Sequence, residues 1–333
     1  MSVLFILGSS YLHAQKIARE DLKKLHAIDD SLGKYGAKIL DEALPGNRLR
    51  ADSMFTRILV RGLKVPYSFY FHFDSLQTAP VVYPADSSFR LITWHYTVDD
   101  ANFHQRGALQ VNTPDGSLKL FPLYDVSDYS DNLEDSIRTP NNWVGAVYYN
   151  IVQKTAGGKN IYTLLGYDEN NDRTTRKWIE TLSFNEHGEP RWGGSFTGSS
   201  DSANPKPKTS RRFLLEYKKG ASAKLNYDAD EDMIIMDHLV SESNEPDKKY
   251  SLVPGGDYEA FIWKDGIWVN QPKVFTQNLG DGNEPKPALI LSDNGLPDET
   301  KLMEQSEKNM GEQPKPKAET TKKDVKKNPK KKQ

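Results

Sequence analysis

The chain has 333 residues, no cysteine and a formal net charge of −2. The absence of cysteine excludes disulfides, thiolate metal ligands, a catalytic thiol and a lipid-modified cysteine. The charge is uneven, because residues 301–333 hold eleven lysines and five acidic residues and the preceding body is acidic. An acidic body lacks the basic face that specific nucleic-acid binding requires, whereas the basic tail suits nonspecific contact with anionic surfaces.

Residues 1–14 are predicted to be a signal peptide. The apolar run Val3–Leu7 is followed by small residues and by Ala14, with no charged side chain in the stretch. This order is the pattern of a signal peptidase substrate, although no basic residue precedes the apolar run; the alternative is a buried N-terminal strand. The stretch is shorter than the ~20 apolar residues of a membrane-spanning helix, and no longer apolar run follows. We therefore expect no transmembrane span, a periplasmic or secreted location, and a mature chain that begins at Gln15.

Residues 15–64 are predicted to form an N-terminal helical segment. Between residues 16 and 43, apolar side chains recur at steps of three and four, with lysine and aspartate between them. The turn residues Leu44–Asn47 end this helix, and a second short amphipathic piece is expected at Ala51–Leu63. We expect one N-terminal helix to pack across the rest of the fold.

Residues 65–275 are predicted to be an antiparallel β domain, because the hydrophobic period changes to two and aromatic and β-branched residues become frequent. The candidate strands are Phe69–Phe73, Phe89–Val98, Gly107–Val111, Leu118–Leu123, Val144–Lys154, Ile161–Asp168, Trp178–Phe184, Arg191–Thr197, Arg212–Tyr217, Ala223–Tyr227, Met233–His238, Tyr258–Trp263 and Ile267–Asn270. Short turns such as Thr113–Gly116 and Asn185–Gly188 require antiparallel neighbours. The sequence thus predicts a mainly β fold, a long antiparallel meander that forms either a barrel or a two-layer sandwich.

Residues 276–333 are predicted to be a disordered tail rich in lysine and proline. From Gly311 to Gln333 the chain has no aromatic residue, so it cannot bury enough apolar surface to offset the entropy of ordering. Removal of the chain beyond Gly280 is therefore expected to change the melting temperature by only about a degree.

The sequence contains no recognisable catalytic or metal-binding motif. The segment Gly193–Thr197 resembles a nucleophile elbow but lacks its closing glycine. The segment Asp168–Asp172 resembles the start of a calcium loop, but Arg173 and Ile179 stand where glycine and glutamate are required. We predict no cofactor and no metal site, and the sequence does not decide whether the protein is an enzyme.

The connector Tyr167–Trp178 is the predicted ligand-binding segment. Asp168, Asn171 and Asp172 offer exposed acceptor oxygens, and Arg176 and Lys177 add positive charge in the same connector. Loops on a rigid sheet commonly carry function. The alternative is that Asp168 and Arg176 pair across the mouth of a hairpin and only define its shape.

Trp192 is the remaining candidate for ligand binding. It precedes Gly193 and Gly194, which would allow a backbone or a ligand to approach closely. Aromatic residues on strands more often fill a core, which is the alternative for this tryptophan as for the other five.

Several segments stand out in order along residues 65–270, namely Ser68–Leu76, Asp86–Trp94, Tyr162–Asp168, Thr175–Lys177, Arg212–Tyr217, Tyr227–Asp228, Asp237–Leu239 and Tyr258–Phe261. Together they resemble a family of exported, signal-peptide-bearing bacterial envelope proteins of unknown function. The resemblance implies export and a β-rich body, and it implies no catalytic residue.

Two functions agree with these observations. The first is a non-catalytic binding or structural module of the bacterial envelope, with a glycan or an envelope protein as its partner. The alternative is a hydrolase of envelope polymers or glycans that uses carboxylates as acid and base. A deep cleft with two facing carboxylates would favour the hydrolase, and an aromatic groove would favour binding.

Overall fold

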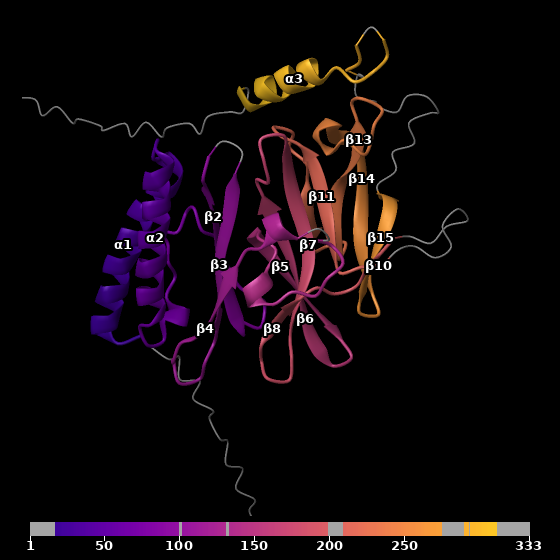
Figure 1. Cartoon of the computed structure of the whole chain (residues 1–333). Coiled ribbons are helices and arrows are strands. Elements are labelled where there is room, and N and C mark those ends of the chain that lie inside the picture. The colour runs from indigo at the N-terminus through magenta and orange to yellow at the C-terminus, as the bar shows by residue number, and fades with distance from the viewer. Residues whose placement is uncertain are drawn as a thin grey trace, which may run out of the picture.

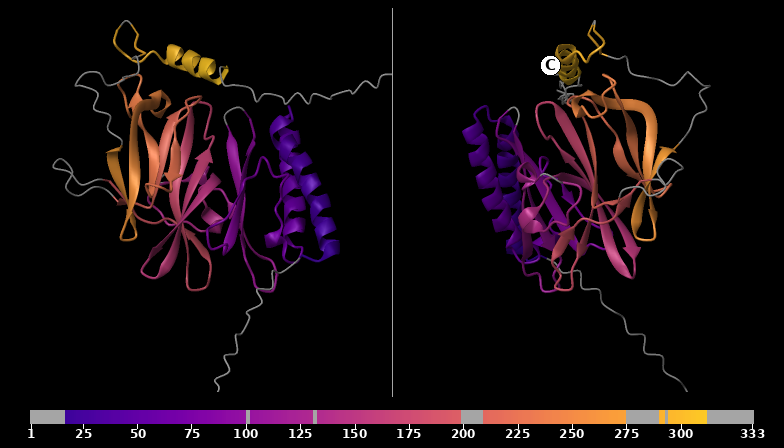
Figure 2. Two further views of the ribbon diagram at one scale, coloured as in Figure 1. Left: turned by 180° about the vertical axis from the view of Figure 1, so that it is seen from behind. Right: turned by 45° about the vertical axis from the view of Figure 1, so that its right-hand side comes forward.

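The computed structural model describes residues 17–99, 102–130, 133–198, 209–274, 290–292 and 294–311; the predicted signal peptide and residues 312–333 lie outside this part. The described body is a stack of four layers, a pair of helices followed by three β-sheets (Figure 1). The two further views in Figure 2 show the same order of layers.

The helical layer consists of α1 (Arg19–Asp41) and α2 (Pro45–Leu63), which pack against each other. Pro45 stands in the first turn of α2, where its missing N–H leaves no hydrogen bond unmade. The second helix therefore begins before the predicted Ala51, and two helices rather than one cover the sheet.

The first sheet has the strand order β1-β2-β3-β4, with every pair antiparallel. Its strands are β1 (Val81–Val82), β2 (Phe89–Thr97), β3 (Phe103–Val111) and β4 (Lys119–Tyr124). Alternate residues of β2 enter different cores, because successive side chains of a strand point to opposite faces. Ile92 and Trp94 pack against the helices, whereas Phe89 and Leu91 pack against the second sheet.

The predicted strand Phe69–Phe73 is wrong, because Ser68–Tyr70 form a 3-10 turn. The fully buried Arg90 explains the difference. Its guanidinium donates hydrogen bonds of 2.9 Å to the carbonyl of Ser68 and of 2.9 Å to that of Phe71. A side chain from β2 thus binds carbonyls that a sheet would otherwise pair, and the phenyl rings of Phe71 and Phe73 remain buried under the helices.

The second sheet has the order β11-β7-β6-β5, and β8 pairs with β7. Its strands are β5 (Val147–Ala156), β6 (Lys159–Asp168), β7 (Thr174–Phe184), β8 (Pro190–Trp192) and β11 (Arg212–Lys218). Trp178 on β7 packs towards the first sheet and the adjacent Ile179 packs towards the third. Both faces of this sheet are therefore covered.

The third sheet has the order β10-β9-β15-β14-β13-β12. Its strands are β9 (Phe196–Thr197), β10 (Thr209–Ser210), β12 (Leu225–Asp228), β13 (Met233–Ser241), β14 (Leu252–Lys264) and β15 (Ile267–Val274). The pair β15–β9 is parallel and the others are antiparallel.

The prediction of a mainly β, largely antiparallel fold is confirmed, and of its two forms the layered one is observed. Three open sheets stack face to face, one more than a two-layer sandwich contains. The chain departs from a simple meander where β9 and β11 pair with strands distant in sequence.

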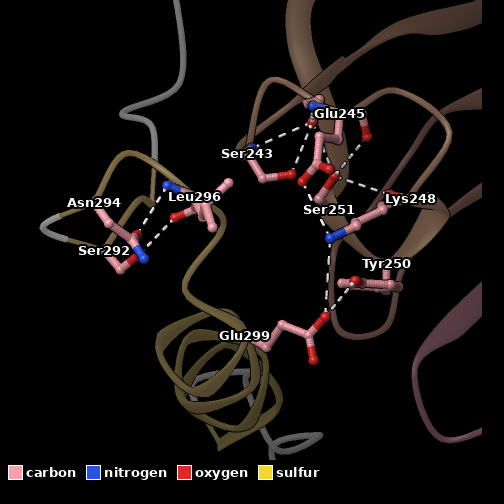
Figure 3. Close-up of polar contacts among 10 residues, drawn as sticks. Ser243, Glu245, Lys248, Tyr250, Ser251, Ser292, Asn294, Leu296 and Glu299 are labelled. Atoms are coloured by element: carbon pink, nitrogen blue, oxygen red, sulfur yellow. Dashed lines mark hydrogen bonds and ion pairs between the residues drawn. The ribbon is translucent and has the colours of Figure 1, made fainter.

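A third helix, α3 (Glu299–Gly311), lies within the predicted tail, and the sequence did not anticipate it. It lies across one end of the sheet layers (Figures 1 and 2). Glu299 points towards Tyr250, whose hydroxyl donates to its carboxylate at 3.1 Å, and towards Lys248 (Figure 3). The side chain of Leu302 is buried, at 2% exposure. The helix is therefore docked on the body, at least through its first turn.

We expect Leu302→Ala to release α3 without unfolding the sheets. Deleting a buried leucine side chain costs about 2–5 kcal/mol in a core, which is enough to free a helix held by few contacts. Hydrogen exchange of residues 299–311 should become faster while exchange of β6 and β7 is unchanged. Met303→Ala, at a side chain that is 52% exposed, is the matched control. Slow exchange of α3 in Leu302→Ala would contradict docking through Leu302.

Candidate binding pocket

A pocket of about 600 Å³ lies where the end of the second sheet meets β12 of the third sheet. We call it the layer pocket. Its larger side chains are three tyrosines, two lysines and one glutamate, namely Tyr149, Tyr167, Tyr217, Lys177, Lys219 and Glu169. They come from β5, from β7 and from the ends of β6 and β11.

Strand register brings these side chains together. Tyr167 of β6 is directly opposite Lys177 of β7, and Tyr217 of β11 is opposite Thr175. Thr175 and Lys177 are two residues apart on one strand, so they share a face of the sheet. The register shift of β5 between residues 148 and 150 accompanies the exposure of Tyr149 to the same face.

Part of the polar lining is bonded within the protein. The Tyr149 hydroxyl donates to the carbonyl of Leu225 at 2.7 Å, and the Tyr167 hydroxyl donates to Glu169 at 2.6 Å. Lys219 forms an ion pair with the same glutamate. These contacts fix the position of the Glu169 side chain in the pocket wall.

The pKa values in the layer pocket reflect its burial. Burial raises the pKa of Tyr149, Tyr167 and Tyr217 above the ordinary value of a phenol, so all three are neutral donors at pH 7. Burial also acts to raise the pKa of Glu169, but hydrogen bonds from Lys219 and Tyr167 hold it below its ordinary value. Glu169 is therefore an ion bound to its neighbours rather than a proton donor.

Four other polar groups of the lining have no hydrogen-bond partner within the part of the chain that the structure describes. They are the hydroxyls of Thr175, Tyr217 and Ser222 and the side-chain amide of Asn226. Tyr217 is only 2% exposed and Thr175 only 4%. Ser222 and Asn226 are exposed, so the four groups offer their hydrogen-bonding capacity to water or to a molecule in the pocket.

Asp168, a predicted site residue, does not line the layer pocket. It follows Tyr167 on β6 and therefore faces the first sheet, with 4% exposure. Its carboxylate accepts hydrogen bonds from Gln105 Nε2 at 2.5 Å and from the Asn170 N–H at 2.8 Å. Burial raises the pKa of Asp168 to about 7. The acceptor that the sequence predicted to be exposed is enclosed between two sheets.

The other residues of the predicted loop have separate positions. The Asn171 side chain accepts the N–H groups of Arg173 and Thr174 at 2.9 and 2.8 Å, which shapes the turn. Asp172 is exposed on the side of α3. The structure therefore disperses the predicted acceptors instead of gathering them.

Arg176 is opposite Asp168 in the register of β6 and β7, as the hairpin alternative required. Its ion pair is nevertheless with Glu216 of β11, at 3.0 Å. The guanidinium therefore connects β7 to β11, and its charge only moderates the pKa of Asp168.

Trp192 is fully buried in the core between the first and second sheets. A Cβ atom on Gly194 would meet the Thr181 side chain at 2.1 Å. The absence of a side chain at Gly194 allows β7 to approach closely. Trp192 is therefore a core residue, as the alternative prediction stated.

Four pocket residues, Tyr167, Glu169, Thr175 and Lys177, belong to the predicted segment Tyr167–Trp178, and of these Lys177 was predicted to supply positive charge. It lies on β7, not in a loop. Tyr149, Tyr217 and Lys219 were missed, since the signal for them is strand register, which local periodicity does not provide.

No family model, no curated protein and no solved structure matches the chain. Among the described residues, no group of three or more histidine, aspartate or glutamate side chains is placed to hold a metal ion. No helix of that part of the chain is long and apolar enough to cross a membrane.

Proposed function

We propose that the protein is an exported, non-catalytic binding protein whose layer pocket holds a small glycan. The carrying observation is that the hydroxyls of Tyr217 and Thr175, on side chains at most 4% exposed, have no partner in the described part of the chain and lie beside the tyrosine rings of the pocket. A saccharide presents hydroxyls to such groups and a ring face to an aromatic side chain, and a pocket of this volume has the size of a ligand site. The export part of the proposal rests on the apolar pattern of residues 1–14 and on the family resemblance.

The arrangement of carboxylates favours binding over hydrolysis. A two-carboxylate glycosidase needs a carboxylic acid and a second carboxylate about 5–10 Å apart across its substrate. Glu169 is the single acidic side chain among the described residues that line the layer pocket, and it is bound to Lys219 and Tyr167. Asp168 has a pKa suited to an acid catalyst, but it is enclosed on the other face of the sheet.

The proposal is tested by saturation-transfer NMR with a panel of neutral and acidic di- and trisaccharides. We expect transfer to at least one saccharide in the unchanged protein, and loss of that transfer in Tyr217→Ala. Tyr129→Ala, at a side chain that is 87% exposed and outside the pocket, should retain it. Absence of transfer to every member of the panel, or equal transfer in Tyr217→Ala, would reject the proposal.

A further inference from the structure

The lysines of the layer pocket differ in their partners. Lys219 has a counter-ion, because it pairs with Glu169 and also donates to the Glu169 carbonyl at 2.9 Å. The ammonium of Lys177 donates one hydrogen bond, of 2.6 Å, to the neutral carbonyl of Ala223. It has no ion pair with any residue that the structure describes. An ammonium carries three N–H donors, so two donors of Lys177 have no hydrogen-bond partner there.

The surroundings of Lys177 further destabilise its positive charge, which lacks a bound counter-ion. Its side chain is partly buried, with the Tyr149 ring 6.0 Å from the ammonium. Burial lowers the pKa of Lys177, and the charge of Asp237 acts in the opposite direction. Asp237 forms no ion pair with Lys177 in the described part of the chain, and its carboxylate accepts the N–H of Lys224 at 2.6 Å. A cation in this setting is stabilised by an anion that enters the pocket.

A second donor lies within reach of the same anion. Lys177 is opposite Leu215 across the β7–β11 pair, and Tyr217 is opposite Thr175, so Lys177 and Tyr217 are diagonal neighbours on one face. Diagonal neighbours of a sheet are about 7–8 Å apart at the backbone, so the side chains of Lys177 and Tyr217 extend from neighbouring positions into the same pocket. The Tyr217 hydroxyl has no partner in the described part of the chain and is a neutral donor.

We infer that the layer pocket selects a saccharide that carries a carboxylate, which Lys177 and the Tyr217 hydroxyl bind together. The hydroxyls of Thr175 and Ser222 and the amide of Asn226 remain for the sugar hydroxyls. This inference rests on the proposed function and adds the charge of the ligand to it.

The experiment compares trigalacturonate with galactotriose, which differ in carrying a carboxylate or a hydroxymethyl group on each ring. Titration calorimetry of the full chain should show that the acidic sugar binds more tightly by on the order of tenfold, because a charge-assisted hydrogen bond is made only with it. Lys177→Met should abolish this preference, so that the variant binds trigalacturonate no more tightly than galactotriose. Lys34→Met, at an exposed lysine of α1, should leave both affinities unchanged.

Two further measurements test whether Tyr217 and Lys177 bind the carboxylate. Tyr217→Phe removes one donor without changing charge or ring and should weaken the binding of trigalacturonate more than that of galactotriose. The pKa of Lys177, followed through the ¹³C shift of its ε-carbon, should rise when trigalacturonate is added. Circular dichroism establishes that each variant is folded.

The outcomes separate the two proposals. Equal affinity for both sugars would overturn the inference and leave the glycan-binding function intact. Binding of neither sugar, with no transfer in the saccharide panel, would overturn both. Binding of inorganic phosphate with the same dependence on Lys177, and of no sugar, would show a general anion site and overturn the saccharide assignment.

Discussion

Arg212→Met is expected to lower the free energy of unfolding by about 3–5 kcal/mol, because it leaves a buried carboxylate without its cation. Arg212 of β11 is 0% exposed and its Nε donates to Glu180 of β7 at 3.0 Å. Glu180 is 1% exposed and its other partner is the Tyr148 hydroxyl, which is neutral. One hydrogen bond from a phenol does not compensate a carboxylate that has been removed from water.

Urea unfolding monitored by tryptophan fluorescence measures this loss. Arg191→Met is the matched control, since its ion pair with Glu189 is at the surface and should contribute less than about 1 kcal/mol. The double variant Glu180→Leu/Arg212→Met removes both charges and should recover most of the lost stability. If Arg212→Met costs no more than Arg191→Met, the buried pair is not what holds β7 and β11 together.

Asp168→Asn is expected to stabilise the protein above pH 7 and to leave its stability unchanged at pH 4. The pKa of Asp168 is raised from 3.8 to about 7 by burial, so the folded state retains a proton that the unfolded state releases. Ionisation therefore favours unfolding between pH 4 and pH 7, and the penalty is complete above pH 7. With about 1.4 kcal/mol per pKa unit, the gain from Asp168→Asn reaches at most about 4 kcal/mol at pH 8. Asparagine retains an acceptor for the N–H of Asn170.

The measurement is urea unfolding of Asp168→Asn and of the unchanged protein at pH 4, 6 and 8. Asp172→Asn, at an exposed carboxylate four residues away, should change stability by no more than about 0.5 kcal/mol at any of these pH values. A difference between Asp168→Asn and the unchanged protein that does not grow with pH would show that the Asp168 carboxyl is solvated in the folded protein.

The sequence alone was sufficient for the class of the fold and for the location of most of its elements. The helical period up to Leu63 and the alternation that follows are local signals, and each reports which face of one element avoids water. Turn signals such as Asn185–Gly188 were equally local, and a hairpin turn lies there between β7 and β8. The short strand predicted at Phe69–Phe73 was wrong because its carbonyls bind Arg90, a residue about twenty positions further along the chain.

Only the tertiary structure decided the number of layers and the composition of the candidate site. Alternation along a strand shows that a side chain faces inward, but not what the neighbouring layer places against it. Asp168 and Tyr167 are adjacent in sequence, yet one is enclosed against the first sheet and the other lines the layer pocket. The pocket exists because strand register sets Lys177 beside Tyr167 and Tyr217, and the register of β7 and β11 depends on pairing between residues about forty positions apart.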